Sequence, residues 1–446
     1  MSTKLIFTLG TGDYKLINYE LNGQTYETRF AAIASRFFHD TCNPDNPVVA
    51  AWVIVTPESK KKNLQHLEAA WPIDLPLKLI ELSDASQVKS WWGLFDRVAE
   101  VISEGDRLVL DITHGFRSMP ILSLLMISFL KTVRNADLSM LSYGALDATE
   151  NNLTPVFDLT PLVSLLDWTQ AVNLFDRSGD SRQLAQLIDA QNRQHYKESK
   201  GADGPKTLAR LATQLKDFSL SLQTFRYEAA ADTAQKLERT LQGFSTSPAD
   251  REVSPALHLL EPRIRHAIAP FTNTTNQIVS DLSVQRQLLE WFYQRQQYLP
   301  YIALLAETLI EYMAQALNIA SLVGAIDNRD LKRVHHYTST ILTGFEHDLK
   351  GAQEEAEEKP WRIGNFVVDE ALNQLDQTTL KQQIKVEETL LKAATLYAQV
   401  RPLRNSLMHA DWSADEATNS GSAIQKKVET FHAQVLGILD SRSDRA

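Results

Sequence analysis

The residues best suited to bind a ligand lie in one short segment, Thr113-His-Gly-Phe-Arg-Ser118. Thr113 and Ser118 carry hydroxyls, His114 an imidazole, and Arg117 a guanidinium with five N–H donors, which are the groups that bind phosphates and sugars. Gly115 has no side chain, so the backbone there can approach a ligand closely. We expect this segment to be a binding loop. The alternative is a capped strand-to-helix turn whose polar residues are incidental.

The flanking segments predict where this loop lies. Leu108–Ile112 is a short apolar run typical of a buried parallel strand, and Ile121–Leu130 is an apolar helix. The loop therefore follows the carboxyl end of a strand. Helix N-termini and backbone N–H groups point to that edge of an open α/β sheet and favour anions.

A second loop, Gly10-Thr-Gly12, follows the first predicted strand, Lys4–Leu9. Because it leaves the same edge of the sheet, we expect Gly10, Thr11 and Gly12 to face the first loop across one crevice. The dinucleotide-binding fingerprint requires a third glycine, and Lys15 occupies that position, so an NAD enzyme is not expected.

A different kind of chemistry is indicated by Arg404-Asn-Ser-Leu-Met-His409. Arginine can stabilise the charge of a phosphorane, and histidine can move protons at a 2′-hydroxyl or a leaving 5′-oxygen. Arg404, Asn405 and His409 thus suit phosphodiester cleavage. On a regular helix Arg404 and His409 diverge by about 140° unless the helix ends or bends between them, yet both can line one groove. The alternative is an exposed Arg and His in a polar turn.

Strand and helix signals alternate over the first 160 residues, and strand signals then stop. The predicted strands are Lys4–Leu9, Val48–Val55, Leu77–Leu82, Leu108–Ile112 and Leu138–Tyr143, with helices near Thr28–Phe38, Lys60–Ala70, Gln87–Ile102 and Ile121–Leu130. This alternation predicts a mostly parallel sheet covered by helices on both faces. Heptad-like apolar spacing beyond about Pro161 predicts helices only. The predicted fold class is an α/β Rossmann-like domain followed by an all-α region.

Three parts are expected along the chain: residues 1–160 as the sheet domain, 161–290 as a helical connector, and 291–446 as a second helical domain. Loop-rich composition at Lys200–Pro205 and Gly243–Pro255 places a boundary near the second of these or shortly after it. A helix-turn-helix-like role for 161–290 stays open. The acidic run Glu354–Pro360 is interpreted as a solvated helix end.

Composition excludes several classes of protein. A net charge of −10 argues against a long basic face that coats nucleic acid, though it leaves room for a small local site. No apolar run is long enough to span a bilayer, and Met-Ser-Thr-Lys leads straight into a predicted strand, so we expect a cytoplasmic protein without a membrane partner. The single cysteine, Cys42, excludes an intramolecular disulfide.

No metal site is expected. His335, His336 and His347 lack a cysteine or carboxylate cluster at ligand spacing, so we interpret them as surface histidines.

Together, Gly10-Thr-Gly12, Asp111–Pro120 and Arg404-Asn-Ser-Leu-Met-His409 resemble the CRISPR-associated CARF–HEPN ribonucleases, the accessory effectors of type III CRISPR systems. Supporting matches are Asp13-Tyr14 through Thr28-Arg-Phe30 and Gln297-Tyr298 followed by Glu307.

The resemblance implies a Rossmann-like CARF domain that dimerises and binds a cyclic oligoadenylate activator. The loop residues named above, Gly10–Gly12 and Thr113–Ser118, would hold that activator. It also implies a HEPN domain in which Arg404, Asn405 and His409 of two subunits meet and cut single-stranded RNA without a metal. The products would be a 2′,3′-cyclic phosphate and a 5′-hydroxyl.

The activator is expected to be cyclic tetra-adenylate, because a two-fold dimer presents each loop twice and a ring of even symmetry satisfies both copies. No resident cofactor is expected. The competing hypothesis is a non-catalytic ligand sensor that acts through its helical half, for example by binding DNA. Slow degradation of the activator by Thr113, His114 and Ser118 is a further hypothesis, and assembly beyond the homodimer stays open.

Overall fold

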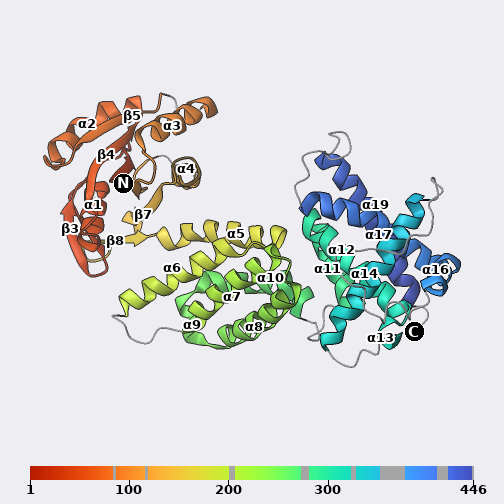
Figure 1. Ribbon diagram of the computed structural model, residues 1–446. Helices are drawn as coiled ribbons and strands as arrows, with labels where there is room; N and C mark the ends of the chain where they lie inside the picture. The colour runs from red at the N-terminus through yellow and green to blue at the C-terminus, as the bar shows by residue number, and fades with distance from the viewer. Residues whose placement is uncertain are drawn as a thin grey trace. The chain divides into compact units, whose positions relative to one another are not determined.

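The computed structural model describes residues 1–83, 87–115, 119–199, 206–272, 281–322, 328–351, 377–408 and 420–443. The chain divides into two compact units, Met1–Asp167 and Trp168–Ala446 (Figure 1). The first unit is an α/β structure and the second is helical, which confirms the predicted fold class. The division of the helical part at residue 290 stays a prediction.

The first unit alternates strands and helices in the predicted order. Its elements are β1 (Thr3–Thr8), β2 (Ile17–Leu21), β3 (Gln24–Thr28), α1 (Ala31–Cys42), β4 (Val48–Val55), α2 (Pro57–Ala70), β5 (Leu77–Glu81), α3 (Val88–Val101), β6 (Arg107–Asp111), α4 (Met119–Arg134), β7 (Asp137–Gly144), a short 3₁₀ turn (Leu146–Ala148) and β8 (Leu153–Asp158).

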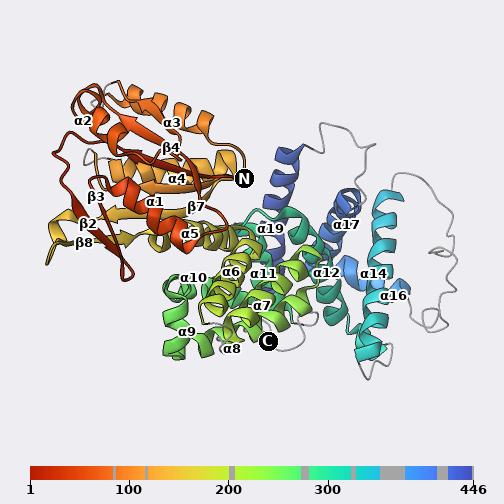
Figure 2. The ribbon, with the colours of Figure 1, turned by 90° about the vertical axis from the view of Figure 1, so that its left-hand side faces the viewer.

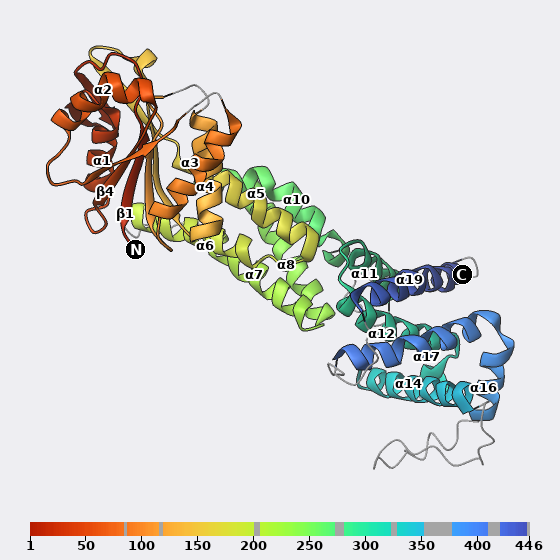
Figure 3. The ribbon, with the colours of Figure 1, turned by 90° about the horizontal axis from the view of Figure 1, so that it is seen from above.

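The eight strands form one sheet in the order β3-β2-β8-β7-β6-β1-β4-β5. The strands from β7 to β5 pair in parallel, whereas β2 with β3 and β7 with β8 pair antiparallel. Alternate residues of β1 serve two cores: Leu5 and Phe7 pack under α1, and Ile6 packs with residues of α3 and α4. Figure 3 shows α1 and α2 on one face of this sheet and α3 and α4 on the other.

Three strands at one side of the sheet, β2, β3 and β8, were not predicted. β2 alternates the apolar residues Ile17, Tyr19 and Leu21 with polar ones, which is typical of a half-buried strand, whereas β3 is mostly polar. The signal that could have identified them is Asn22-Gly23, a common hairpin turn whose two residues have φ of 54° and 80°. The predicted helix at Thr28–Phe38 consequently starts too early, because Thr28 ends β3 and α1 begins at Ala31.

The second unit consists of helices in all its described parts. After α5 (Thr160–Ser178), which spans the division between the units, come α6 (Arg182–Glu198), α7 (Lys206–Gln223), α8 (Tyr227–Thr246), α9 (Pro248–Val253), α10 (Pro255–Thr272), α11 (Leu282–Gln294), α12 (Tyr298–Ala316), α13 (Ile319–Leu322), α14 (Asn328–Gly351), α16 (Gln377–Val386), α17 (Glu388–Met408) and α19 (Gly421–Ser443).

The loop predicted over Gly243–Pro255 is wrong, because the end of α8, all of α9 and the start of α10 occupy it. Ser247 caps α9 by accepting from the backbone N–H of Asp250, and Pro248 suits its first turn. Residues that signal a turn here therefore mark helix ends rather than a linker. The predicted loop at Lys200–Pro205 and the acidic run Glu354–Pro360 lie outside the described residues.

Helix α12 is the centre of the helices that follow α10. It is apolar around most of its circumference and buried along its length. It packs against α11, α14, α17 and α19, and α14 also packs against α17 (Figure 2). Polar residues on α12 that lie among these helices are therefore held by several elements at once.

Candidate functional sites

The two loops expected to form a crevice do meet at the carboxyl edge of the sheet. β1 and β6 are parallel neighbours, so Gly10–Gly12 and Thr113–Gly115 leave the same edge. Thr8 at the end of β1 donates a hydrogen bond to the carbonyl of His114. A Cβ on Gly10 would lie 3.4 Å from the backbone nitrogen of Gly115, so the loops are in close approach. Gly115 has a φ of 135°, which favours glycine.

Asn63 and Tyr14 hold the glycine loop. The buried Asn63 amide on α2 donates to the carbonyls of Gly10 and Gly12, each at 2.9 Å. The Tyr14 hydroxyl accepts from the backbone N–H of Gly10 at 2.8 Å. Sequence reasoning did not identify Asn63. The available signal was its place four residues from Leu67 on the buried face of a helix, where an amide needs partners.

A buried carboxylate fixes the second loop from below. Thr113 Oγ1 donates to Asp111 Oδ2 at 3.0 Å and accepts from the backbone N–H of Gly144 at 2.8 Å. Ser35 and Ser142 also donate to Asp111 Oδ2, at 2.9 and 3.3 Å. Burial raises the pKa of Asp111 to about 6, although these hydrogen bonds oppose the rise. The Thr113 hydroxyl is therefore engaged within the protein.

His114 presents a neutral imidazole at this edge. Its ring meets the Tyr14 ring edge-on, with centroids 4.5 Å apart. Burial lowers its pKa to about 4, and its buried Nε2 has no hydrogen-bond partner among the described residues. Arg117 and Ser118, the other predicted ligand-binding residues of this loop, lie outside the described residues.

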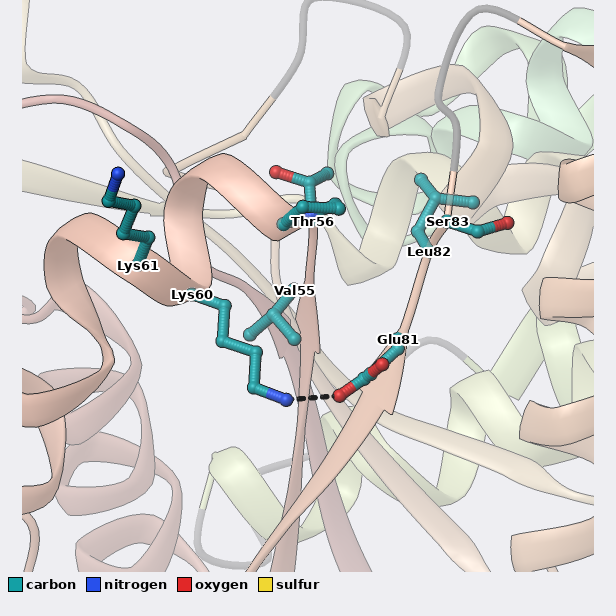
Figure 4. A pocket seen from close by; sticks show the side chains of 8 residues that line it. Val55, Thr56, Lys60, Lys61, Glu81, Leu82 and Ser83 are labelled. Atoms are coloured by element: carbon teal, nitrogen blue, oxygen red, sulfur yellow. Dashed lines mark hydrogen bonds and ion pairs between the residues drawn. The ribbon is translucent and has the colours of Figure 1, made fainter.

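A cavity of about 410 Å³ lies beside these loops, at the ends of β4 and β5. Lys60, Lys61, Glu81 and Ser83 are among its lining residues, and Lys60 is paired with Glu81 (Figure 4). Thr56 also lines it, but its hydroxyl accepts from the Ser59 backbone N–H at 3.2 Å and caps α2. Glu81 offsets the charge of Lys60, so Lys61 provides the net positive charge of this cavity at the sheet edge.

The helical unit contains a second site on α12, α14 and α17. Glu307 Oε2 lies 2.5 Å from His335 Nε2, and Glu307 Oε1 lies 3.4 Å from Arg404 Nη1. All three line a cavity of about 580 Å³, together with Tyr227, Leu304 and Met408 among others. A cavity of this volume can hold a nucleotide-sized group.

The structure places the predicted catalytic residues only in part. Arg404 lies in the cavity and the half-buried Asn405 follows it on α17, whereas His409 lies outside the described residues. His335 is partly exposed, as expected of a surface histidine, but its side chain also lines the cavity and pairs with Glu307, which was not predicted. His336 is exposed, as expected.

The charges of Glu307, His335 and Arg404 shift the pKa values of Glu307 and His335. The hydrogen bond to Glu307 raises the pKa of His335, and burial opposes that rise. Burial would raise the pKa of Glu307, but the hydrogen bond and charge of His335, with the charge of Arg404, lower it overall. His335 and Arg404 are two cations able to contact a phosphate, and Glu307 interacts with both. Arg226, Glu228 and Glu311 also line the cavity.

No group of three or more His, Cys, Asp or Glu residues is placed to hold a metal ion in the parts of the chain that the structure describes. Within those same parts, no helix combines the length and apolar character needed to cross a bilayer.

Comparison with known proteins relates part of the helical unit to a named family. Residues 164–277 match the family model of the CRISPR-associated protein MJ1674, second domain. The CRISPR-associated protein MJ1674 of Methanocaldococcus jannaschii is 30% identical over 112 residues. Those residues make up 25% of this chain and 18% of that protein, so the relative is much longer than the part it shares.

Among solved structures, Enterococcus italicus Csm6 bound to cyclic hexa-2′-fluoro-hexa-dAMP aligns with 98% of this chain and 94% of that chain. The sequence identity is 12% and the TM-score 0.39, which is too low to establish a shared fold. The sequence match is limited to residues 164–277, which are similar to the second domain of a CRISPR-associated protein and support the predicted relationship for that segment. The motifs Gly10–Gly12, Asp111–Pro120 and Arg404–His409 lie outside the matched residues.

Proposed function

We propose that this protein is an accessory effector of type III CRISPR defence: an endoribonuclease that cuts single-stranded RNA without a metal and is switched on by a cyclic oligoadenylate. The observation that carries the proposal is the position of Arg404. Its guanidinium lines an open cavity in the helical unit and lies 3.4 Å from a carboxylate that also holds a histidine.

Each predicted catalytic residue has a chemical task in this proposal. Arg404 stabilises the negative charge of the pentacoordinate phosphorane, and Asn405 supplies a neutral hydrogen bond beside it. His409 takes the proton of the 2′-hydroxyl, so that this oxygen attacks the neighbouring phosphorus. The products are a 2′,3′-cyclic phosphate and a 5′-hydroxyl end.

The activator binds at the carboxyl edge of the sheet in this proposal. Gly10, Thr11, Gly12 and Gly115 allow close backbone approach, and the neutral His114 offers a nitrogen to a base or a ribose. Arg117 and Ser118 contact the phosphates. Lys61 on α2 favours an anion there, because it lines the adjoining cavity, in which Lys60 is already paired with Glu81.

Homodimerisation is the second part of the proposal. The apolar side chains of Ile121, Leu125, Phe129 and Val133 are exposed at four-residue spacing along α4, the helix that follows the ligand loop. A second copy packed on this face would cover it and bring two ligand loops together. A ring of even symmetry, such as cyclic tetra-adenylate, would satisfy both loops equally. To shift a dimer from 1:99 to 99:1 active, the ring must favour the active form by about 5.5 kcal/mol.

The test is cleavage of a fluorescent single-stranded RNA in EDTA, with cyclic tetra-adenylate, cyclic hexa-adenylate or no ring. We expect the tetra-adenylate ring to switch cleavage on, and Arg404→Ala and His409→Ala each to lower the rate by at least about 100-fold. Wild-type cleavage by either variant would contradict the assignment. Ring-dependent DNA binding without RNA cleavage would instead support the non-catalytic sensor, and linear products recovered from the ring would reveal a slow degradation of the activator.

A further inference from the structure

The cavity that Arg404 lines also contains a histidine, His335, which is held by a carboxylate. His335 lies on α14 and Arg404 on α17, and both reach the same residue of α12, Glu307. These three helices pack against one another in pairs. The side chains of Glu307, His335 and Arg404 remain 42%, 39% and 32% exposed, so a ligand in the cavity can reach them.

Glu307 uses its two oxygens separately. Oε2 holds His335 through Nε2, and Oε1 faces the Arg404 guanidinium. A carboxylate is rigid, so this shared contact fixes the imidazole and the guanidinium relative to each other. In catalytic triads a carboxylate likewise orients a histidine by hydrogen bonding to one ring nitrogen, and the other ring nitrogen transfers the proton.

The groups that face His335 favour its charged form. Glu307 and Glu311 on α12 attract a proton to the imidazole, and Arg404 on α17 and burial oppose it. The pKa is raised overall. A protonated His335 with Nε2 engaged keeps its second N–H at Nδ1, which is the proton that this residue could donate to a ligand.

We propose that His335 is a further catalytic residue of this site, the general acid that protonates the leaving 5′-oxygen, and that Glu307 is its positioning residue. This inference rests on the ribonuclease function proposed above. In the step, the 2′-oxygen bonds to phosphorus and gives its proton to His409, while the bond from phosphorus to the 5′-oxygen breaks. The proton on Nδ1 of His335 passes to that oxygen, and solvent then restores both histidines.

The walls of the cavity fit this assignment. Leu304 and Met408 supply apolar surface near the charged groups. Arg404 accounts for the charge on the phosphorane, but a leaving alkoxide also needs a proton, and arginine does not release one. His335 lines the same cavity and, when protonated, can supply that proton.

The first experiment compares the rates at which activated His335→Gln and His336→Gln cleave single-stranded RNA. His336 is the matched control, because it neighbours His335 on α14, is exposed and is not among the residues that line the cavity. We expect His335→Gln to slow single-turnover cleavage by at least about 100-fold and His336→Gln to leave the rate unchanged. Thermal unfolding of both variants reports whether they fold as the wild type does.

A substrate with sulfur in place of the leaving 5′-oxygen separates acid catalysis from a structural role. A thiolate leaves without being protonated, so His335→Gln should cut this RNA at nearly the wild-type rate, whereas His409→Ala should stay slow. If His335→Gln lost the same factor in rate on both substrates, or kept full activity on ordinary RNA, the assignment of His335 would be refuted. The ribonuclease proposal would not be affected. A wild type that cuts neither RNA would overturn the ribonuclease proposal, and this inference with it.

Glu307→Gln gives an independent readout in case His335→Gln does not fold. The rate falls as the pH rises through the pKa of a general acid, because the protonated form is required. Loss of the Glu307 charge lowers the pKa of His335, so this limb of the pH–rate profile should move to lower pH. An unmoved limb would contradict the assignment.

Discussion

Replacing Asp111 by Asn tests whether the ionised carboxylate beneath the ligand loop destabilises the folded protein. Asp111 is 2% exposed at the end of β6 and accepts hydrogen bonds from Ser35, Thr113 and Ser142. Its pKa rises from 3.8 to about 6 on folding, chiefly through burial. The folded protein therefore binds more protons than the unfolded chain between these two values. Wild-type stability should fall as the pH rises through that window and stay reduced above it.

The size of the effect follows from the shift. A rise of roughly 2 pKa units corresponds to about 3 kcal/mol, of which about 2 kcal/mol falls between about pH 4.5 and about pH 7.5. Asn cannot ionise, so Asp111→Asn removes this pH dependence. The hydrogen bonds that change in the variant add a cost that does not depend on pH. The unfolding free energy of Asp111→Asn minus that of wild type should therefore be about 2 kcal/mol more favourable at about pH 7.5 than at about pH 4.5.

Hydrogen exchange of β1 and β6 amides in the full chain measures the unfolding free energy of the first unit separately from that of the helices. Asp106→Asn is a matched control, because burial at Asp106 is outweighed by Lys4 and neighbouring N–H groups, which lower its pKa to about 2. Asp106 is ionised in both states over this range, so its variant should be destabilised equally at both pH values. A difference between Asp111→Asn and wild type that does not change with pH would refute the reasoning.

Two further substitutions test how the loops are held. Asn63→Ala leaves the carbonyls of Gly10 and Gly12 without their side-chain donor. We expect the unfolding free energy of the first unit, measured in urea, to fall by about 1–3 kcal/mol and the ring to bind more weakly. An unchanged unfolding free energy would contradict this role. Gly144→Ala places a Cβ 3.1 Å from Thr113 and should cost about 1–3 kcal/mol, whereas Gly12→Ala meets nothing within 4 Å and should be neutral in the same assay.

The sequence predicted the strands that are buried on both faces. The predicted Val48–Val55 coincides with β4, and the predicted strand at Leu108–Ile112 is offset by one residue from β6. A strand between two helical layers must be apolar throughout, which leaves a clear pattern. β2, β3 and β8 lie at the side of the sheet where burial is partial, so they lack a continuous apolar run. The alternation of Ile17, Tyr19 and Leu21 before Asn22-Gly23 was the available signal for β2.

The loop residues were predictable because their function depends on backbone position, which glycines and strand ends reveal. The contacts that hold them were not, because Asn63 reaches Gly10 across 53 positions of the chain. The same limit explains His335. Its partner Glu307 lies 28 residues away on another helix, and spacing along one helix cannot show that two helices pack side by side.

The strand order has a consequence for how the ligand site can change. From β1 the chain first forms β2 and β3 at the far side of the sheet, then adds β4 and β5 next to β1 through α1 and α2, and finally adds β6 and β7 on the other side of β1 through α3 and α4. The segment after β1 therefore leaves toward β2, which lies beyond β6 and β7, and it contacts the loop after β6 at the carboxyl edge. Side chains that stabilise the fold point into the two cores, and those that would select a ligand extend beyond the strand ends. Residues beyond the strand ends can thus be substituted while the core residues stay constant, so relatives with this strand order can recognise different ligands at the same edge of the sheet.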